Sequence, residues 1–325
     1  MASSGKSSPA GDGFTHGIDY TDPYFVGWFF GVPAAYTVLA LLFRALGWWD
    51  FKLKVNKKKA GETKKTLQDS TTRASDDMAF ELVAGFCVAY LAGAGFVATF
   101  GLLGVRDYEM LLAAPFYGDS LFVRRHLVYP MINYQGWNVV LCFLLEVLGD
   151  PSMIAHHIVT GSLAYLGLHP YLHLRGLFFL GIAEVTNIPL TLFDVCKKFE
   201  SIGKTAASRK ARLEFKGEGE GPELQKSLLH EVSQAVFALS FIIFRLILWP
   251  YHCYFFWTGS VDLIVAGHHG SEQVHSRAVV IYFLVSNVFL TGLQVFWGKQ
   301  IIEGLLKVLG LLGPGKAKAS GKKSQ

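Results

Sequence analysis

The chain has 325 residues, of which 51% are hydrophobic and 17% charged, and its formal net charge is +5. A soluble domain usually carries about a quarter charged residues, and here the charges collect between long apolar runs. This pattern excludes an ordinary soluble domain and favours a multi-spanning membrane protein. The basic segments lack aromatic residues at the spacing of a base-stacking surface, so we expect no nucleic-acid partner.

Seven apolar segments are long enough, or nearly so, to cross a hydrocarbon core that needs about 20 helical residues. The fourth and fifth are short and close together, with Pro170 at the expected turn between them. We therefore predict an all-α, polytopic membrane bundle of about seven transmembrane helices. The segments lie near residues 24–47, 78–104, 127–148, 152–170, 172–196, 230–257 and 278–306.

The connections between these segments predict an orientation. Residues 48–77 and 197–229 and the tail 307–325 hold most of the lysines and arginines, and seven crossings bring all three to one side. Cytoplasmic connections carry such an excess of basic residues. We expect 48–77 and 197–229 to be flexible cytosolic loops and 307–325 a cytosolic tail. Residues 1–23, which are small and polar without a signal-peptide pattern, are predicted to form a disordered lumenal tail.

Small residues recur in two of the predicted spans. Gly85, Ala89 and Gly93 form a row in the second span, and Gly27 and Gly31 form a shorter one in the first. Such rows let helix backbones approach closely in lipid. We therefore predict close helix contacts along both rows.

Several ionisable residues fall within or at the edges of the apolar segments. Each costs about 2.5–3.5 kcal/mol at the centre of a span on insertion scales, so such residues tend to face the interior of a bundle. The residues concerned are Glu146, His156, His157, Glu184, Asp194 and Arg245.

Two of the spans carry polar stripes. With about 100° per residue, Ser152, His156 and Thr160 fall within about 80° of one another in the fourth span, and His157 lies on their flank. A second stripe in the fifth span has the same width. If the two helices pack side by side, the stripes line an intramembrane cavity. The second stripe consists of Glu184, Asn187, Thr191 and Asp194.

These stripes allow two interpretations. A carboxylate that orients an imidazole in a low dielectric is a plausible general acid–base pair, so His156, His157 and Glu184 are candidate catalytic residues. Alternatively, the stripes only hydrogen-bond and hold the bundle together, at about 0.6 kcal/mol per contact. Arg245 is the expected counter-charge of Glu184 or Glu146, in a structural ion pair.

Four segments in order are similar to segments of a known family. They are "SMIAHHIVTGSLAYLG", "RGLFFLGIAEVTNIPLTLFDVCKK", "ALSFIIFRLILWPYH" and "NVFLTGLQVFWGKQII". From about residue 120 to 300 the chain resembles the TLC-domain family, which includes the ceramide synthases and the translocating-chain-associated membrane proteins. The resemblance implies six core helices over 78–306 around a lipid-accessible cavity, with one extra helix before them.

The resemblance also implies a chemistry. In ceramide synthases the histidine pair, matching His156 and His157, serves acyl transfer from acyl-CoA to a sphingoid amine, which makes acyl-CoA the candidate co-substrate. Ceramide synthases carry a His-Asp-x-x-Asp segment where this chain has residues 183–187, "AEVTN". Asn138 is the nearest counterpart of an Asp that often precedes the pair. The chain therefore resembles the divergent TLC-domain proteins, which are linked to membrane-lipid composition, more closely than it resembles the ceramide synthases.

The site expected from the stripes and the resemblance has three catalytic residues and a set of cavity residues. The function it predicts is membrane-lipid metabolism or homeostasis, with acyl transfer in the cavity. The alternative is a non-enzymatic protein that binds lipid or regulates membrane composition. The expected cavity residues are Ser152, Thr160, Asn187, Thr191, Asp194 and Asn138.

Other interpretations are weaker. A di-iron hydroxylase needs several histidine boxes, yet neither His156-His157 nor His268-His269 has a histidine three residues before it. The four cysteines lie in or beside apolar runs without a CxxC pair, so we expect buried thiols and no metal. A transporter lacks support because no inverted repeat is visible. The loop 267–276, with His268, His269 and His275, is expected to be a solvent-exposed connection between helices and not a metal site.

The chain ends in Lys322-Lys323-Ser324-Gln325. Lysines at the third and fourth positions from the end resemble the dilysine retrieval signal of endoplasmic-reticulum membrane proteins, and such signals are read by a receptor. We therefore expect a multi-pass protein of the endoplasmic-reticulum membrane whose tail is recognised by a coat protein. Membrane lipids are its other expected partners, and the sequence is compatible with self-association into an oligomer.

Overall fold

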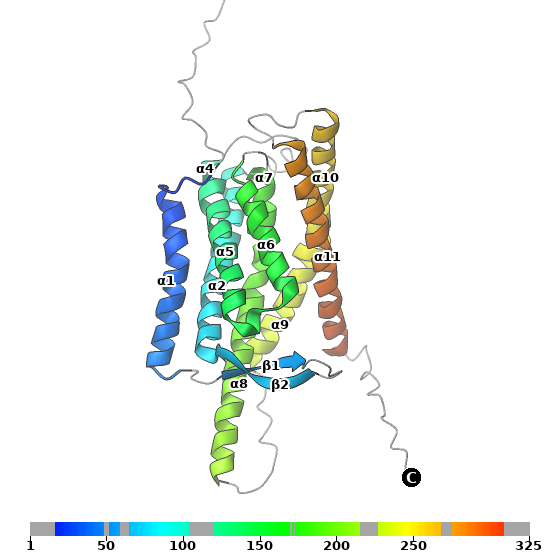
Figure 1. The fold of residues 1–325 in the computed structure, drawn as a ribbon. Helices are drawn as coiled ribbons and strands as arrows, with labels where there is room; N and C mark the ends of the chain where they lie inside the picture. Colours follow the sequence, from blue (N-terminus) through cyan, green and yellow to red (C-terminus); the bar gives the residue numbers. More distant parts are fainter. Residues whose placement is uncertain are drawn as a thin grey trace, which may run out of the picture.

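The computed structural model describes residues 17–48, 52–58, 65–103, 120–169, 171, 173–214, 227–267 and 275–308. Within these residues the chain forms seven helical segments that run side by side (Figure 1). Five of them are long and apolar enough to cross a membrane. The structure therefore confirms the predicted all-α, polytopic bundle, with one small sheet that the sequence reasoning did not include.

Four segments are built from one principal helix. They are α1 (Pro23–Ala45), α2 (Ala74–Phe96), which continues as a π-helix η1 (Val97–Leu103), α6 (Pro151–Leu166) and α11 (Arg277–Val308). Helix α6 has 16 residues and so spans roughly 24 Å. It is the short fourth segment that the sequence predicts.

Three segments change helix type along their length. The third consists of α4 (Leu121–Val123), a π-helix η2 (Arg124–Val128) and α5 (Tyr129–Leu144). The fifth is α7 (His173–Gly176), a π-helix η5 (Leu177–Gly181), a 3₁₀ helix η6 (Ile182–Thr186) and α8 (Asn187–Glu214). The sixth is α9 (Leu228–Phe241), a π-helix η7 (Ile242–Leu248) and α10 (Trp249–Val265).

Prolines account for three of these irregular stretches, η2, η6 and η7. Pro130, Pro189 and Pro250 have no backbone N–H, so each removes the hydrogen bond to the carbonyl four residues earlier. Those carbonyls lie in η2, η6 and η7, where the regular α-helical ladder gives way to π or 3₁₀ turns. Helix interruptions of this kind occur often at functional sites. The one in the fifth segment carries Glu184, and the one in the sixth carries Arg245.

The basic segment 48–77 is not simply a flexible loop. Residues Lys52–Lys58 (β1) and Lys65–Arg73 (β2) pair as an antiparallel hairpin, and α2 follows directly from Ala74. The hairpin lies across one end of the bundle (Figure 1), which we call the hairpin end. Our prediction missed it because the lysine-rich strands carry no alternating apolar pattern that would mark a half-buried strand.

The second basic segment also begins as a helix. Helix α8 continues to Glu214 and projects beyond the hairpin end (Figure 1), so the loop predicted from residue 197 is wrong over 197–214. The last turns of α11 lie at the same end. The described parts of the two basic connections and the C-terminal end of α11 therefore lie at the hairpin end.

Ion pairs tie three helices together near this end. The Arg44 guanidinium of α1 lies 2.6 Å from the Asp76 carboxylate of α2. The Lys198 ammonium of α8 lies 2.7 Å from both the Asp77 and the Glu81 carboxylates of α2. A single lysine shared by two carboxylates neutralises part of a buried acidic group that would otherwise be costly.

The close helix contacts differ from those predicted. A side chain at Gly85 would meet Thr191, which agrees with the predicted row, but a Cβ added at Gly93, Gly27 or Gly31 would have nothing within 4 Å. The closest approach lies between Gly95 of α2 and Gly181 of η5, where an added Cβ would be 2.7 Å from the facing backbone. Helix rotation, which a row of small residues does not specify, decides which glycines meet.

The core lies between α1, α2, α5 and the irregular fifth segment. Tyr129, Leu127 and Leu91 are fully buried there, with Leu177 nearly so. Helix α1 contributes few buried residues and exposes most of its apolar side chains, as a helix at the lipid-facing periphery does. The four cysteines are buried, as predicted.

Candidate functional site

Two adjoining cavities lie inside the bundle. The larger has a volume of about 470 Å³ and reaches Val147, Leu148 and Asp150 at the hairpin end. The smaller, of about 80 Å³, runs toward Arg175, Phe256 and Phe283. We call them the wide and the narrow cavity. Four side chains line both cavities and form what we call the polar waist, namely His156, Glu184, Arg245 and Gln294.

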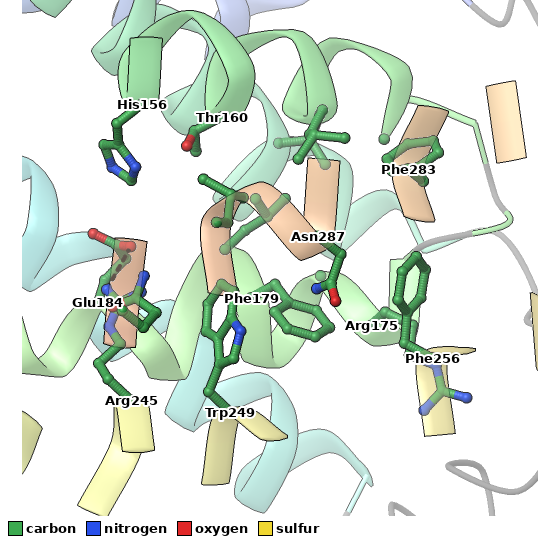
Figure 2. Close-up of a pocket in the computed structure, with 17 residues that line it drawn as sticks. His156, Thr160, Arg175, Phe179, Glu184, Arg245, Trp249, Phe256, Phe283 and Asn287 are labelled. Atoms are coloured by element: carbon green, nitrogen blue, oxygen red, sulfur yellow. Dashed lines mark hydrogen bonds and ion pairs between the residues drawn. The ribbon is translucent and has the colours of Figure 1, made fainter. Parts of the chain in front are cut away.

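The narrow cavity is mainly apolar beyond this waist. Figure 2 shows His156 and Thr160 extending into it from α6, with Glu184 and Arg245 together at one end and Phe256 and Phe283 at the other. Between them the wall is formed by apolar and aromatic side chains, including Leu163, Phe179, Trp249 and Leu290. A cavity of this size and lining suits the first few methylene groups of an alkyl chain whose polar group lies at the waist.

His157 is held by a partner that the sequence analysis missed. Its Nδ1 lies 2.6 Å from the Gln135 carboxamide oxygen of α5, and both side chains are buried and line the wide cavity. With this oxygen as acceptor, Nδ1 carries the proton and Nε2 keeps the lone pair. Gln135 therefore positions the ring and makes Nε2 the nitrogen that is available as a base.

His156 has a different environment. Its ring lies 5.4 Å from that of His157, with an angle of 61° between the planes, and 5.6 Å from the Trp297 ring of α11. Its Nδ1 is buried and has no hydrogen-bond partner among the described residues. The two adjacent histidines thus diverge, as predicted, with one anchored by a carboxamide and the other beside an indole.

Glu184 lies at the waist but does not pair with a histidine. Its Oε1 lies 3.3 Å from the Arg245 guanidinium, and its Oε2 accepts a hydrogen bond of 2.7 Å from the Asn187 carboxamide. Arg245 also donates to the Thr186 hydroxyl. Both carboxylate oxygens are therefore engaged within the fifth and sixth segments, and the orienting contact on His157 comes from Gln135.

Glu146, the other predicted partner of Arg245, lies elsewhere. Its carboxylate accepts hydrogen bonds from the Thr71 backbone N–H at 3.0 Å and from the Ser70 hydroxyl at 3.1 Å. Glu146 thus connects η3 (Glu146–Leu148) to β2. The prediction of an Arg245–Glu146 pair is wrong, because α5 ends at Leu144 and leaves Glu146 outside the span.

The structure brings together most of the predicted cavity residues. Asn187, Thr191 and Asp194 line the wide cavity with both histidines, and Thr160 lines the narrow one. Ser152 instead lies in the first turn of α6, where its hydroxyl donates to Asp150. Asn138 is buried in α5 and is absent from both cavity walls.

The remaining histidines do not assemble a metal site in the described part of the chain, where no group of three or more His, Cys, Asp or Glu side chains is placed to hold an ion. His275 bonds to the Leu166 carbonyl at 2.7 Å, and its ring lies 4.1 Å from that of His169. His268 and His269 lie outside the described residues. His173 Nδ1 accepts a hydrogen bond from the Ser120 backbone N–H.

Gln135, Gln294 and Trp297 are the site residues that sequence reasoning missed. Each is a single polar or amphipathic residue in an apolar helix, and an uncharged amide costs less to bury than a charge. The sequence offers one indication for two of them: Gln294 and Trp297 are three residues apart and therefore share a helix face.

The comparison with known families agrees with this arrangement. A family model described as TLC domain matches residues 128–303, which is more than half of the chain. No curated protein and no solved structure matches the chain significantly. The matched region contains the histidine pair and all four residues of the polar waist. The chain therefore belongs to the TLC-domain family.

Proposed function

We propose that this membrane protein acts in membrane-lipid metabolism by transferring an acyl group from acyl-CoA to a lipid amine inside the two-part cavity. The observation that carries the proposal is the hydrogen bond from His157 Nδ1 to Gln135, which leaves Nε2 as a base in the wide cavity. The family's link to lipid metabolism and the apolar narrow cavity, which suits the first methylene groups of an alkyl chain, support it.

The reaction assigns a role to each part of the site. His157 Nε2 accepts a proton from the amine while the amine nitrogen attacks the acyl carbonyl. The new C–N bond forms, the C–S bond of the thioester breaks, and the leaving thiolate takes up the proton from the imidazolium. The Glu184–Arg245 pair shapes the waist and joins the two irregular helices, so Glu184 acts as a positioning residue in this scheme.

Lipid profiles of cells that carry defined variants test the proposal. His157→Ala is expected to change the abundance of a lipid class at normal protein level, because it removes the base. The matched control is His126→Ala, which removes a histidine that bonds to Tyr90 outside the cavities. If His157→Ala alters only protein abundance, or if His126→Ala changes the same lipid class, acyl transfer is contradicted.

A second candidate function is lipid binding without turnover. It is favoured by one observation, the engagement of both Glu184 oxygens by Arg245 and Asn187, which leaves the histidines without a carboxylate partner. Mass spectrometry of the protein in nanodiscs distinguishes the two functions. A retained lipid amine that stays unmodified after addition of acyl-CoA supports binding alone, whereas conversion to the amide supports transfer.

We further propose that the protein resides in the endoplasmic-reticulum membrane with its C-terminus in the cytosol and its N-terminus in the lumen. The support is the gathering of basic segments at the hairpin end, together with Lys322 and Lys323, which lie outside the described residues. Cytoplasmic connections of membrane proteins carry the excess of basic residues. The same tail would provide the contact with a coat protein.

A further inference from the structure

Two buried polar side chains, Thr160 and Gln294, lie at the junction of the cavities. Thr160 is 9% exposed and lines the narrow cavity, and its Oγ1 has no hydrogen-bond partner among the described residues. Gln294 is 2% exposed and lines both cavities. Buried polar groups are nearly always hydrogen-bonded, and an unsatisfied one costs about 1–3 kcal/mol. Thr160 lines the narrow cavity, so a ligand that enters this cavity can supply the missing hydrogen-bond partner of its hydroxyl.

The two side chains face the same space from opposite helices. Thr160 lies one turn after His156 on α6, and Figure 2 shows both side chains extending into the narrow cavity. On α11, Leu290, Gln294 and Trp297 follow one another at four- and three-residue intervals, so they share a face. The Trp297 ring lies 5.6 Å from that of His156, which turns this face toward α6.

The chemistry of the two groups limits what they can bind. A glutamine carboxamide and a threonine hydroxyl each supply a hydrogen-bond donor, so together they suit one oxygen that offers two lone pairs. On one side of this oxygen the cavity wall is apolar, with Leu163, Phe179 and Leu290. On the other side the wide cavity carries polar side chains, among them His157 and Asp194.

We propose that Thr160 and Gln294 form a carbonyl-binding site for the amide, ester or thioester of a long-chain acyl compound, with the first methylene groups of the acyl chain in the narrow cavity. The inference deepens the proposed function and rests on it for the identity of the reacting group. It assigns to Gln294 a substrate contact, because its N–H would donate to the carbonyl oxygen. An oxygen held in this way is the atom at which charge develops during acyl transfer.

The test is a binding measurement that needs no turnover. The full chain in nanodiscs is titrated with methyl palmitate and with hexadecyl methyl ether, which differ only in the replacement of C=O by CH₂, and affinity is read from thermal stabilisation. For two hydrogen bonds to the carbonyl we expect the wild type to bind the ester roughly tenfold more tightly than the ether.

Variants of similar volume identify the residues responsible. Gln294→Met and Thr160→Val are each expected to reduce the preference for the ester to about threefold, because each removes one donor. Gln300→Met is the matched control, since Gln300 lies on the same helix and lines only the wide cavity. It is expected to keep the full preference.

Several outcomes overturn the site. These are a wild type without preference for the ester, a Gln294→Met variant that keeps the tenfold preference, and variants that lose affinity for both compounds equally. Failure of the proposed function is read separately, by adding acyl-CoA and a lipid amine to the same nanodiscs. A chain that prefers the ester but forms no amide retains the carbonyl site and lacks the proposed transferase activity.

Discussion

His157 and Gln135 lie on different helices, yet a single hydrogen bond between them decides which nitrogen of the ring faces the wide cavity. A carboxylate at this position would favour the charged imidazolium, whereas a carboxamide supports the neutral ring. A neutral imidazole is the form that can accept a proton. The chemistry of His157 therefore depends on Gln135, an uncharged residue that is distant from it in sequence.

The first prediction concerns this contact. Gln135→Met keeps the volume but leaves the buried His157 Nδ1 without a partner, so we expect a loss of about 1–3 kcal/mol of stability. Thermal unfolding in nanodiscs measures it, with Gln300→Met as the control because Gln300 is exposed. Equal midpoints for the two variants would show that the contact contributes nothing to stability.

The second prediction concerns the Glu184–Arg245 pair, in which both side chains are buried. Removal of one partner leaves an unpaired charge, so Arg245→Met is expected to destabilise the protein by about 3–5 kcal/mol. The double variant Arg245→Met with Glu184→Gln removes both charges and is expected to recover part of this loss. Unfolding of the four proteins in a double-mutant cycle measures the coupling, and a double variant no more stable than Arg245→Met would contradict it.

Among the helices, position along the chain was easier to predict than orientation. The polar stripes of α6 and of the fifth segment line one cavity because the two helices are close and their periodicity is local. The row of small residues in α2 was a poorer guide, since Gly95 makes the closest contact and Gly93 faces open space. A difference of two residues turns a helix face by about 200°, so small errors of register exchange inside and outside.

The third prediction uses this pair of glycines. Gly95→Ala places a methyl group 2.7 Å from the Gly181 backbone, which cannot move as a side chain does. We expect it to destabilise the protein by about 1–3 kcal/mol or to lower its expression. Gly93→Ala, on the same helix with nothing within 4 Å, is expected to be neutral or slightly stabilising because alanine favours a helix. Unfolding midpoints that rank the two variants in reverse would refute the contact.

In the molecule as a whole, the described parts of the two basic connections lie at the hairpin end. The wide cavity also reaches this end, at Asp150, Val147 and Leu148. The hairpin is joined to this region by Glu146. If this end faces the cytosol, as proposed, a water-soluble acyl donor reaches the histidines from the cytosolic side. The orientation of the protein in the membrane therefore decides from which side an acyl donor reaches the histidine pair.

The fourth prediction tests this sidedness. Changing Lys322 and Lys323 to Ser is expected to move the protein from the endoplasmic reticulum to later compartments, because a retrieval receptor reads a dilysine tail in the cytosol. Fluorescence microscopy of tagged cells measures the redistribution. Changing Lys316 and Lys318 to Ser removes the same charge upstream and serves as the control. Unchanged localisation of the Lys322–Lys323 variant would remove the support for retrieval.

Hydropathy and helical periodicity are local properties of the chain, so they predict the membrane class, the seven segments and the helices that carry the histidine pair and Glu184. The family follows from the resemblance of four segments in order. The packing of the helices shows which of the two expected carboxylates pairs with Arg245, that Gln135 holds His157, and that Gln294 and Thr160 line one cavity. These relations depend on the rotation and approach of helices far apart in sequence. That rotation is set by packing at contacts such as Gly95–Gly181 and by proline-induced interruptions, whose combined effect no single segment encodes.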